Sequence, residues 1–180
     1  MTTKAKTVLS IGDVDLVDEV SKIVQKISGV QLGAKQHSMV QARLSKRIID
    51  LSLTGPDAYF DFLNSNIEKE SEALVSLLTT HHTFFFREFL HFEFLEKSGL
   101  EKIVQSCRSR GQKKIRIWSA ACSRGQEVYS LAMFLSFHLK QIAPDMGYEI
   151  FGSDVDSDSV QIAKNGVYRW DEVKEIPSIY

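Results

Sequence analysis

The chain has 180 residues, a length that suits one ordinary domain or two small ones and excludes a large two-lobed enzyme. Hydrophobic residues make up 43% and charged residues 25% of the chain, which indicates a globular protein rather than a disordered one. The formal net charge is only −1, so the protein as a whole would not attract nucleic acid or anionic lipid. A partner chosen by charge must therefore be recognised by a local patch.

The N-terminal segment 1–11 is expected to be a frayed leader. It has no apolar run of signal-peptide length, and the sequence has no stretch of about 20 apolar residues that would predict a membrane span. Cys107 and Cys122 have neither metal-ligand spacing nor the pattern of a disulfide framework, so we expect structural roles in a reducing compartment. These features predict a cytoplasmic protein without membrane insertion.

The first half of the chain shows helical periodicity. Apolar residues recur at helical spacing in four stretches, which begin at Asp13, Met39, Pro56 and Ile67. The first is expected to end at Gly29, the second at Leu53 and the fourth at Thr80. Six phenylalanines then occur between Phe84 and Phe94, more than one amphipathic face requires. We interpret this segment as a helix packed on several sides where two domains meet. The alternative is the wall of a cofactor pocket.

A basic stretch follows between Lys97 and Arg116, in which Gly99 and Gly111 bracket a predicted connecting helix. Its charges are interpreted as a solvated face. Nucleic-acid binding is a weaker alternative, because no aromatic residue is interleaved with the basic ones between 98 and 117.

The second half of the chain alternates strands and helices. The pattern predicts a buried strand over 115–121, a helix over 126–142, a strand over 148–153 and a helix over 156–164. Strand, helix, strand and helix in this order favour a parallel sheet with a right-handed crossover. We therefore predict an α/β, Rossmann-like fold for this half.

Two polar sites follow the predicted strands. The turn from Ser119 to Glu127 has small side chains, which would let a ligand approach the backbone at a helix N-terminus. It has one glycine, so it is not the dinucleotide fingerprint. At the end of the second strand, Asp154 either accepts hydrogen bonds from a ribose or caps the next helix, and a cap is favoured for Asp156.

Other site chemistries have little support in the sequence. The five histidines do not form a metal-binding spacing, so no metal site is predicted. There is also no Gly-x-Ser-x-Gly elbow that would indicate a nucleophilic serine.

Three segments of the sequence are similar to the motifs of one known family. The first runs from Leu78 to Glu88 and resembles the family's Thr-Thr-Asn-x-Thr-x-Phe-Phe-Arg-Glu segment. The second runs from Ile117 to Ser130 and resembles its Trp-Ser-Ala-x-x-Ser-Thr-Gly-Glu-Glu-Pro-Tyr-Ser turn. The third is Ser153 to Asp156 followed by Ala163 to Tyr168. With these three segments the chain resembles the chemotaxis receptor glutamate methyltransferases of the CheR type.

The resemblance implies a small all-helical N-terminal domain followed by a Rossmann-like, S-adenosylmethionine-dependent methyltransferase domain. We assign residues 12–97 to a helical receptor-docking domain, 98–112 to a connecting helix and linker, and 113–180 to the first part of the cofactor domain. Family members continue with several more strands, so the cofactor domain is expected to be incomplete. Both faces and one edge of the first strand would then lack partners, which a homodimer could remedy by completing the sheet.

The resemblance also implies roles for particular residues. Thr83 and Arg87 would reach over the methionine end of S-adenosylmethionine, with Arg87 as the catalytic residue whose planar fork suits a carboxylate. Ala121 and Glu127 would lie in the cofactor turn, and Asp154 would bind the ribose. The sequence departs from the family in this turn, where Arg124, Gln126 and Val128 replace threonine, glutamate and proline.

The implied reaction transfers a methyl group to receptor glutamates and leaves S-adenosylhomocysteine. A glutamate side chain ordinarily titrates with a pKa of about 4.3 and is already ionised at neutral pH, so no catalytic base is needed. The partners would be the cytoplasmic helices of chemotaxis receptors, which are acidic. Arg43, Lys46 and Arg47 lie in a segment without acidic residues and are predicted to form the docking face; solvated helix charges are the alternative. A non-catalytic docking or nucleoside-binding module is the alternative function.

Overall fold

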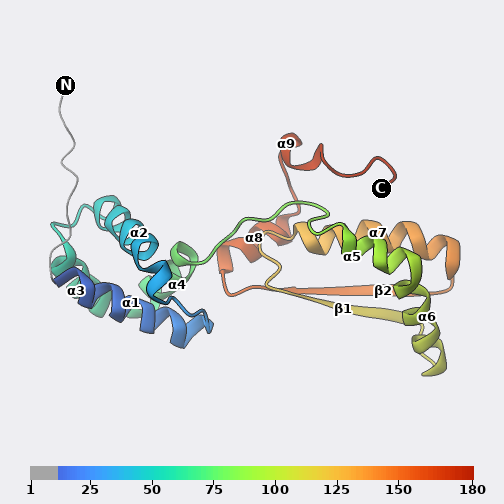
Figure 1. Cartoon of the computed structure of the whole chain (residues 1–180), viewed down its shortest axis with the longest axis horizontal. Coiled ribbons are helices and arrows are strands. Elements are labelled where there is room, and N and C mark those ends of the chain that lie inside the picture. Colours follow the sequence, from blue (N-terminus) through green and yellow to red (C-terminus); the bar gives the residue numbers. More distant parts are fainter. Residues whose placement is uncertain (1–11) are drawn as a thin grey trace. The chain divides into compact units, whose positions relative to one another are not determined.

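The computed structural model describes residues 12–180, with side chains described from Leu16 on, and it divides into two compact units. The first unit ends at Thr80 and the second begins at His81 (Figure 1). The leader predicted for residues 1–11 lies outside the described residues.

The first unit is all helical, as predicted. Its elements are α1 (Gly12–Ser28), the short 3-10 turn η1 (Ala34–Gln36), α2 (His37–Asp50), α3 (Pro56–Ser65) and α4 (Ile67–Leu78). One face of each α-helix supplies the core, which includes Val20, Val24, Val40, Leu44, Tyr59, Leu63 and Leu74. Helix α2 ends three residues before the predicted end at Leu53, because Ser52 adopts a positive φ of 58° that a helix cannot contain.

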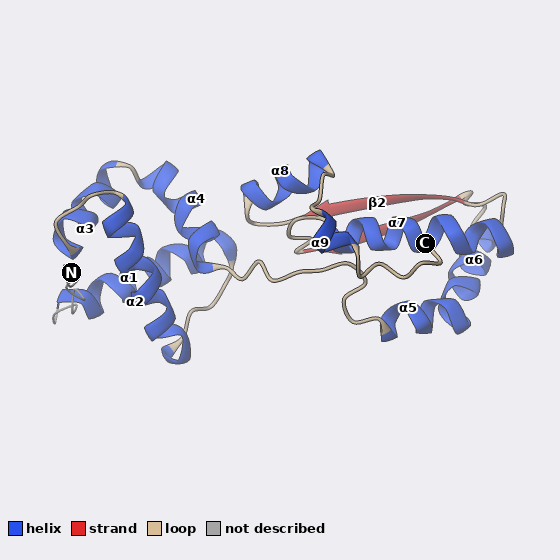
Figure 2. Cartoon of the chain, turned by 90° about the horizontal axis from the view of Figure 1, so that it is seen from above, coloured by secondary structure: helices blue, strands red, loops and turns tan. Residues whose placement is uncertain are grey.

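The second unit contains a parallel two-stranded sheet, β1 (Lys114–Ala120) and β2 (Gly147–Ser153), joined by the crossover helix α7 (Gln126–Ile142). Helix α8 (Ser157–Asn165) and the short helix α9 (Trp170–Val173) follow β2. The register pairs Ile117 with Ile150 and Ser119 with Gly152. Figure 2 shows α7 running alongside the strands, which agrees with the predicted strand–helix–strand order.

The two faces of this sheet differ. Ile115, Ile117 and Ile150 pack on one face into a core that contains Phe134 and Leu135 of α7. The expectation that both faces would lack partners is therefore wrong for this face. On the opposite face Trp118 and Phe151 are neighbours in the register and are 67% and 66% exposed.

The phenylalanine segment is not one helix. Residues 81–89 form a loop, and helical structure begins only at α5 (Leu90–Phe94), which continues through the π-helical turn η2 (Leu95–Gly99) into α6 (Leu100–Ser109). The predicted helix is wrong for Phe84 to Phe89, because Phe86 and Glu88 have positive φ angles of 54° and 55°.

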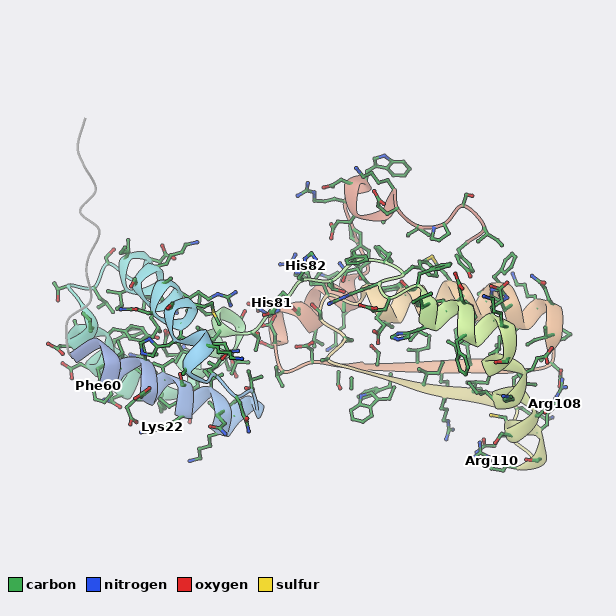
Figure 3. The ribbon with its side chains drawn as sticks, in the orientation of Figure 1. Lys22, Phe60, His81, His82, Arg108 and Arg110 are labelled. Atoms are coloured by element: carbon green, nitrogen blue, oxygen red, sulfur yellow. The ribbon has the colours of Figure 1, made fainter. Side chains whose placement is uncertain are left out.

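The predicted domain boundary differs from the division in the structure. Residues 81–112, which were assigned to the docking domain and the linker, lie in the second unit. Phe85, Phe92, Leu100 and Val104 from this stretch share one core with Phe134 of α7. Helix α6 is therefore part of the second core and not a connector. Its basic side chains Arg108 and Arg110 are solvent-exposed, as the charged-face interpretation predicts (Figure 3).

Across residues 12–180, none of the helices combines the length and the apolar character that crossing a bilayer requires.

Candidate functional site

The turn after β1 has an unusual backbone. Ala121 and Ser123 have φ angles of 60° and 50°, in the left-handed region that non-glycine residues rarely adopt. Gly125 follows with a φ of 92° and is the residue before the first turn of α7. This conformation costs free energy, which the surrounding structure has to offset, and such strain is concentrated at functional sites in proteins.

Gly125 also permits a close approach between segments. A Cβ atom at this position would lie 2.8 Å from Cβ of Ala163 in α8 and 2.9 Å from the hydroxyl oxygen of Tyr168. The Tyr168 hydroxyl donates to the Arg124 carbonyl oxygen at 2.6 Å. Burial raises the pKa of Tyr168 to about 12, with smaller contributions from Tyr129 and Glu172. Tyr168, which follows α8, therefore stabilises the turn after β1 by contacts with Arg124 and Gly125.

Asp154 connects the turn to the end of β2. Its Oδ2 accepts from the backbone N–H of Ser123 at 2.7 Å, and its Oδ1 accepts from the N–H of Asp156 at 3.0 Å. Asp156 is the residue that caps α8, since its Oδ2 accepts from the Ser159 N–H at 3.0 Å. The helix cap predicted for Asp156 is confirmed. Asp154 does not cap α8 but accepts hydrogen bonds from the backbone of Ser123 and Asp156. Each oxygen of Asp154 can accept a further hydrogen bond.

Glu127 lies in the first turn of α7. Its Oε1 accepts from the Ser119 hydroxyl at 2.7 Å, which links α7 to the end of β1. Near it, burial and the negative charge of Asp154 raise the pKa of the Cys122 thiol. Cys122 and Cys107 are both buried and unpaired, consistent with the predicted structural roles.

The loop at 81–89 carries the second strained segment. Phe86 and Glu88, on either side of Arg87, both have left-handed φ angles. Phe86 is held in this conformation by its N–H, which donates to the hydroxyl of the fully buried Ser130 at 2.9 Å. The Ser130 hydroxyl in turn donates to the Gln126 carbonyl oxygen at 2.6 Å. One buried serine therefore joins the loop at 81–89 to α7, the helix that follows the turn after β1.

Thr83 and Arg87 occupy different places in this loop. Thr83 lines a cavity of about 550 Å³ together with Phe84, Phe85 and Gln126. Arg87 is exposed, and its guanidinium donates to the His82 carbonyl oxygen at 2.8 Å. Figure 3 labels His81 and His82 where the chain enters the second unit. His81 contacts the start of α8, with Nδ1 at 3.5 Å from Oδ2 of Asp156 and 3.4 Å from the Ser159 hydroxyl.

The three basic residues proposed for docking are not equivalent. Arg47 forms a bidentate pair with Glu70, with distances of 3.0 and 2.7 Å, and Glu70 is only 2% exposed. Tyr59 also donates to Glu70, at 2.6 Å. The hydrogen bond to Glu70 raises the pKa of Arg47. Arg43 donates to the carbonyl oxygens of Leu77 and Thr79 at the end of α4, whereas Lys46 is exposed.

Sequence reasoning missed Ser130, Tyr168 and the buried partner of Arg47. Ser130 and Tyr168 belong to the segments that resemble family motifs, but no local pattern shows that either contacts a loop more than 40 residues away. In the sequence, Glu70 is an acidic residue in the first turn of a helix, and such residues are usually solvated. The sequence therefore does not indicate that Glu70 is buried.

Groups of histidine, cysteine and carboxylate side chains that could hold a metal ion are not found in the part of the chain that the structure describes.

Comparison with known families matches both units. Residues 81–180 match the family model described as "CheR methyltransferase, SAM binding domain", and residues 16–79 match "CheR methyltransferase, all-alpha domain". The chain belongs to the CheR methyltransferase family. These matches confirm the family resemblance and the fold class inferred from the sequence. They also confirm S-adenosylmethionine as the cofactor of this type of domain.

Among curated relatives of this CheR chain, a chemotaxis protein methyltransferase of Escherichia coli is 35% identical over 158 residues, covering 87% of this chain and 51% of the relative. That of Borreliella burgdorferi is 29% identical over 164 residues, covering 91% of this chain and 58% of the relative. A probable chemotaxis protein methyltransferase of Rhizobium etli is 38% identical over 142 residues, covering 78% and 52%. The chain thus spans about half the length of the curated relatives it matches.

Proposed function

We propose that this protein transfers a methyl group from S-adenosylmethionine to glutamate side chains of chemotaxis receptors. The observation that carries the proposal is the placement of backbone strain. Four of the five non-glycine residues with positive φ in the described part of the chain lie in two segments that resemble family motifs, at Phe86, Glu88, Ala121 and Ser123.

The residues of the turn fit a nucleoside with an amino-acid tail. The Ser123 hydroxyl oxygen is buried without a hydrogen-bond partner, so the turn has an unused polar group. Asp154 keeps acceptor capacity for ribose hydroxyls beyond its two backbone bonds. We assign Thr83, Ala121, Glu127 and Asp154 to cofactor binding, and Arg87 to the cofactor and to catalysis.

The reaction requires the protein mainly to align the methyl donor with the glutamate carboxylate. S-adenosylmethionine supplies, when bound, a methyl group on a positively charged sulfur. The receptor glutamate is ionised at neutral pH, so the site needs no base and has to orient the carboxylate and remove part of its water. Arg87 is exposed and has free guanidinium donors that can orient a carboxylate.

Receptor docking is proposed for the basic face of α2, with Lys46 as its solvent-exposed charge. Arg43 and Arg47 belong to the same predicted face, but both are bonded within the first unit. We expect Lys46→Glu to weaken binding to an acidic receptor helix fragment and to reduce its salt dependence, measured by titration at two ionic strengths. The matched control is Lys69→Glu, an exposed lysine on α4. Equal effects of the two variants would contradict the docking face.

The function is tested by two measurements on the full chain. Titration calorimetry with S-adenosylhomocysteine should show binding that Asp154→Asn weakens. A methyl-transfer assay with receptor fragments should show activity that Arg87→Ala removes. Absence of binding would overturn the cofactor site.

A non-catalytic module that docks receptors or binds a nucleoside is the second candidate. It is favoured by the sheet, which has two strands in the described part of the chain and exposes Trp118 and Phe151 on one face. Binding of S-adenosylhomocysteine without methyl transfer would support this candidate. A homodimer that completes the sheet stays a prediction, which the mass in solution tests, and so does the cytoplasmic location.

A further inference from the structure

The cavity beside Thr83 has an acidic and aromatic lining. It is lined by Asp171 and Glu172 of α9, by Glu175 just after it, and by four phenylalanines of the loop at 81–89. Among the described residues, ten line the cavity, all of them in the second unit, and none of these ten is basic. The cavity is therefore suited to a positively charged ligand.

The carboxylates differ in how far they are already satisfied. Asp171 pairs with Arg169 at 2.7 Å on the exposed surface, an arrangement of little strength in water. Glu172 accepts from the backbone N–H of Arg169 at 3.1 Å. Glu175 is exposed and has no hydrogen bond or ion pair within the described residues. Its charge is available to a ligand.

A second and independent feature is the amide of Gln126. This side chain is 2% exposed and lines the cavity, and its Oε1 has no hydrogen-bond partner. Its Nε2 donates to Oε1 of Glu172 at 3.4 Å. This contact orients the amide and leaves the carbonyl oxygen without a donor. A buried acceptor without a partner is costly, and a donor from a ligand would satisfy it.

The lining also indicates which kind of cation would bind. Within the described residues, these carboxylates do not form a cluster that could hold a metal ion. Phe84 and Phe89, which are 48% and 41% exposed, offer ring surfaces that attract organic cations. An ammonium or guanidinium group on an aliphatic stem would use the carboxylates, the amide oxygen and the rings together.

We propose that this cavity is a subsite for a lysine or arginine side chain of a polypeptide. This inference rests on the proposed function in one respect, which is that the polypeptide is taken to be the methyl acceptor. A basic side chain near the modified glutamate would then be recognised by the acidic cavity.

The test uses the full chain and three blocked peptides that are identical except for one residue, which is lysine, arginine or norleucine. We expect the lysine and arginine peptides to bind about tenfold more tightly than the norleucine peptide in titration calorimetry. Glu175→Gln and Gln126→Leu should each reduce this preference at least about threefold. Glu101→Gln, an exposed glutamate on α6, should leave it unchanged.

Competition experiments separate the sources of the cation. If n-butylammonium displaces the lysine peptide at concentrations near the peptide's own Kd, the site takes a free amine and the polypeptide assignment is wrong. If S-adenosylhomocysteine displaces it competitively, the cavity belongs to the cofactor site and the inference is overturned. Equal binding of the lysine and norleucine peptides would also overturn it. A lysine preference in a chain that fails to bind S-adenosylhomocysteine would contradict the proposed function and support this subsite.

Discussion

At the scale of single residues, the charge of Arg47 was predicted to be available for docking but is paired with Glu70 inside the first unit. Glu70 is buried, and its two oxygens accept three hydrogen bonds, two from Arg47 and one from Tyr59. Removing one partner from such a pair leaves a desolvated charge, which costs more than the pair itself contributes. The main role of Arg47 is therefore to neutralise Glu70.

This role predicts the effect of removing each basic side chain of α2. Arg47→Ala should lower the free energy of unfolding by about 3 kcal/mol, because it leaves Glu70 buried with one partner. Lys46→Ala, one position away on the solvent side, should change it by less than about 0.5 kcal/mol. Urea denaturation followed by far-UV circular dichroism measures both. Similar values for the two variants would show that the buried pair contributes nothing.

Tyr168 predicts a loss of stability at alkaline pH. Its pKa is about 12 in the folded protein, whereas an unfolded tyrosine titrates near its ordinary value of 10. Above pH 10 the unfolded chain loses this proton first, so the stability that Tyr168 contributes is complete below pH 10 and is lost as the pH rises toward 12.

The measurement compares the thermal unfolding of the wild type and Tyr168→Phe between pH 9 and 12. The variant lacks the hydrogen bond to Arg124, so it should start with a lower midpoint but lose less of it across this range. Parallel curves would contradict the assignment to Tyr168. Tyrosines that do not interact with Tyr168 affect both proteins equally and cancel in the difference, whereas Tyr129 contacts Tyr168 and contributes to the difference.

At the scale of elements, the loop at 81–89 depends on a contact with α7. Its sequence is rich in phenylalanine and would suit a helix or a strand by local preference. The Phe86 N–H instead donates to the buried Ser130 hydroxyl, and Phe86 adopts a positive φ that a helix does not contain.

Ser130→Ala should therefore loosen this loop. The variant leaves the Phe86 N–H buried without an acceptor, at a cost of about 1–3 kcal/mol. We expect faster amide exchange at residues 83–88 and weaker binding of S-adenosylhomocysteine. Ser136→Ala, a half-buried serine on the same helix, is the control and should change neither. Unchanged exchange in Ser130→Ala would show that the loop is held by its phenylalanines alone.

At the scale of the whole molecule, the two units have separate hydrophobic cores. Val20, Leu44 and Leu74 belong to the first core, and Phe86, Phe134 and Leu139 belong to the second. Because the two sets share no residue, destabilisation of one unit should leave the other folded.

Amide hydrogen exchange with peptide-level resolution tests this independence. Arg47→Ala should accelerate exchange throughout residues 16–80 and leave residues 81–180 unchanged, since Arg47 and its buried partner Glu70 both belong to the first unit. Acceleration in both units would mean that they unfold as one cooperative body and that the division at Thr80 has no thermodynamic meaning.

The helical first half, the strand–helix–strand order of the second half and the family could all be predicted from the sequence, because they follow from local periodicity and short motifs. The sequence did not predict the boundary between the two units at Thr80, because the helix at Leu100–Ser109 has the same amphipathic pattern whichever core it joins. Nor did it show that Arg47 is paired or that Phe86 is strained. Those outcomes depend on contacts with Glu70 and Ser130, which lie far along the chain, and only the packed structure brings these groups together.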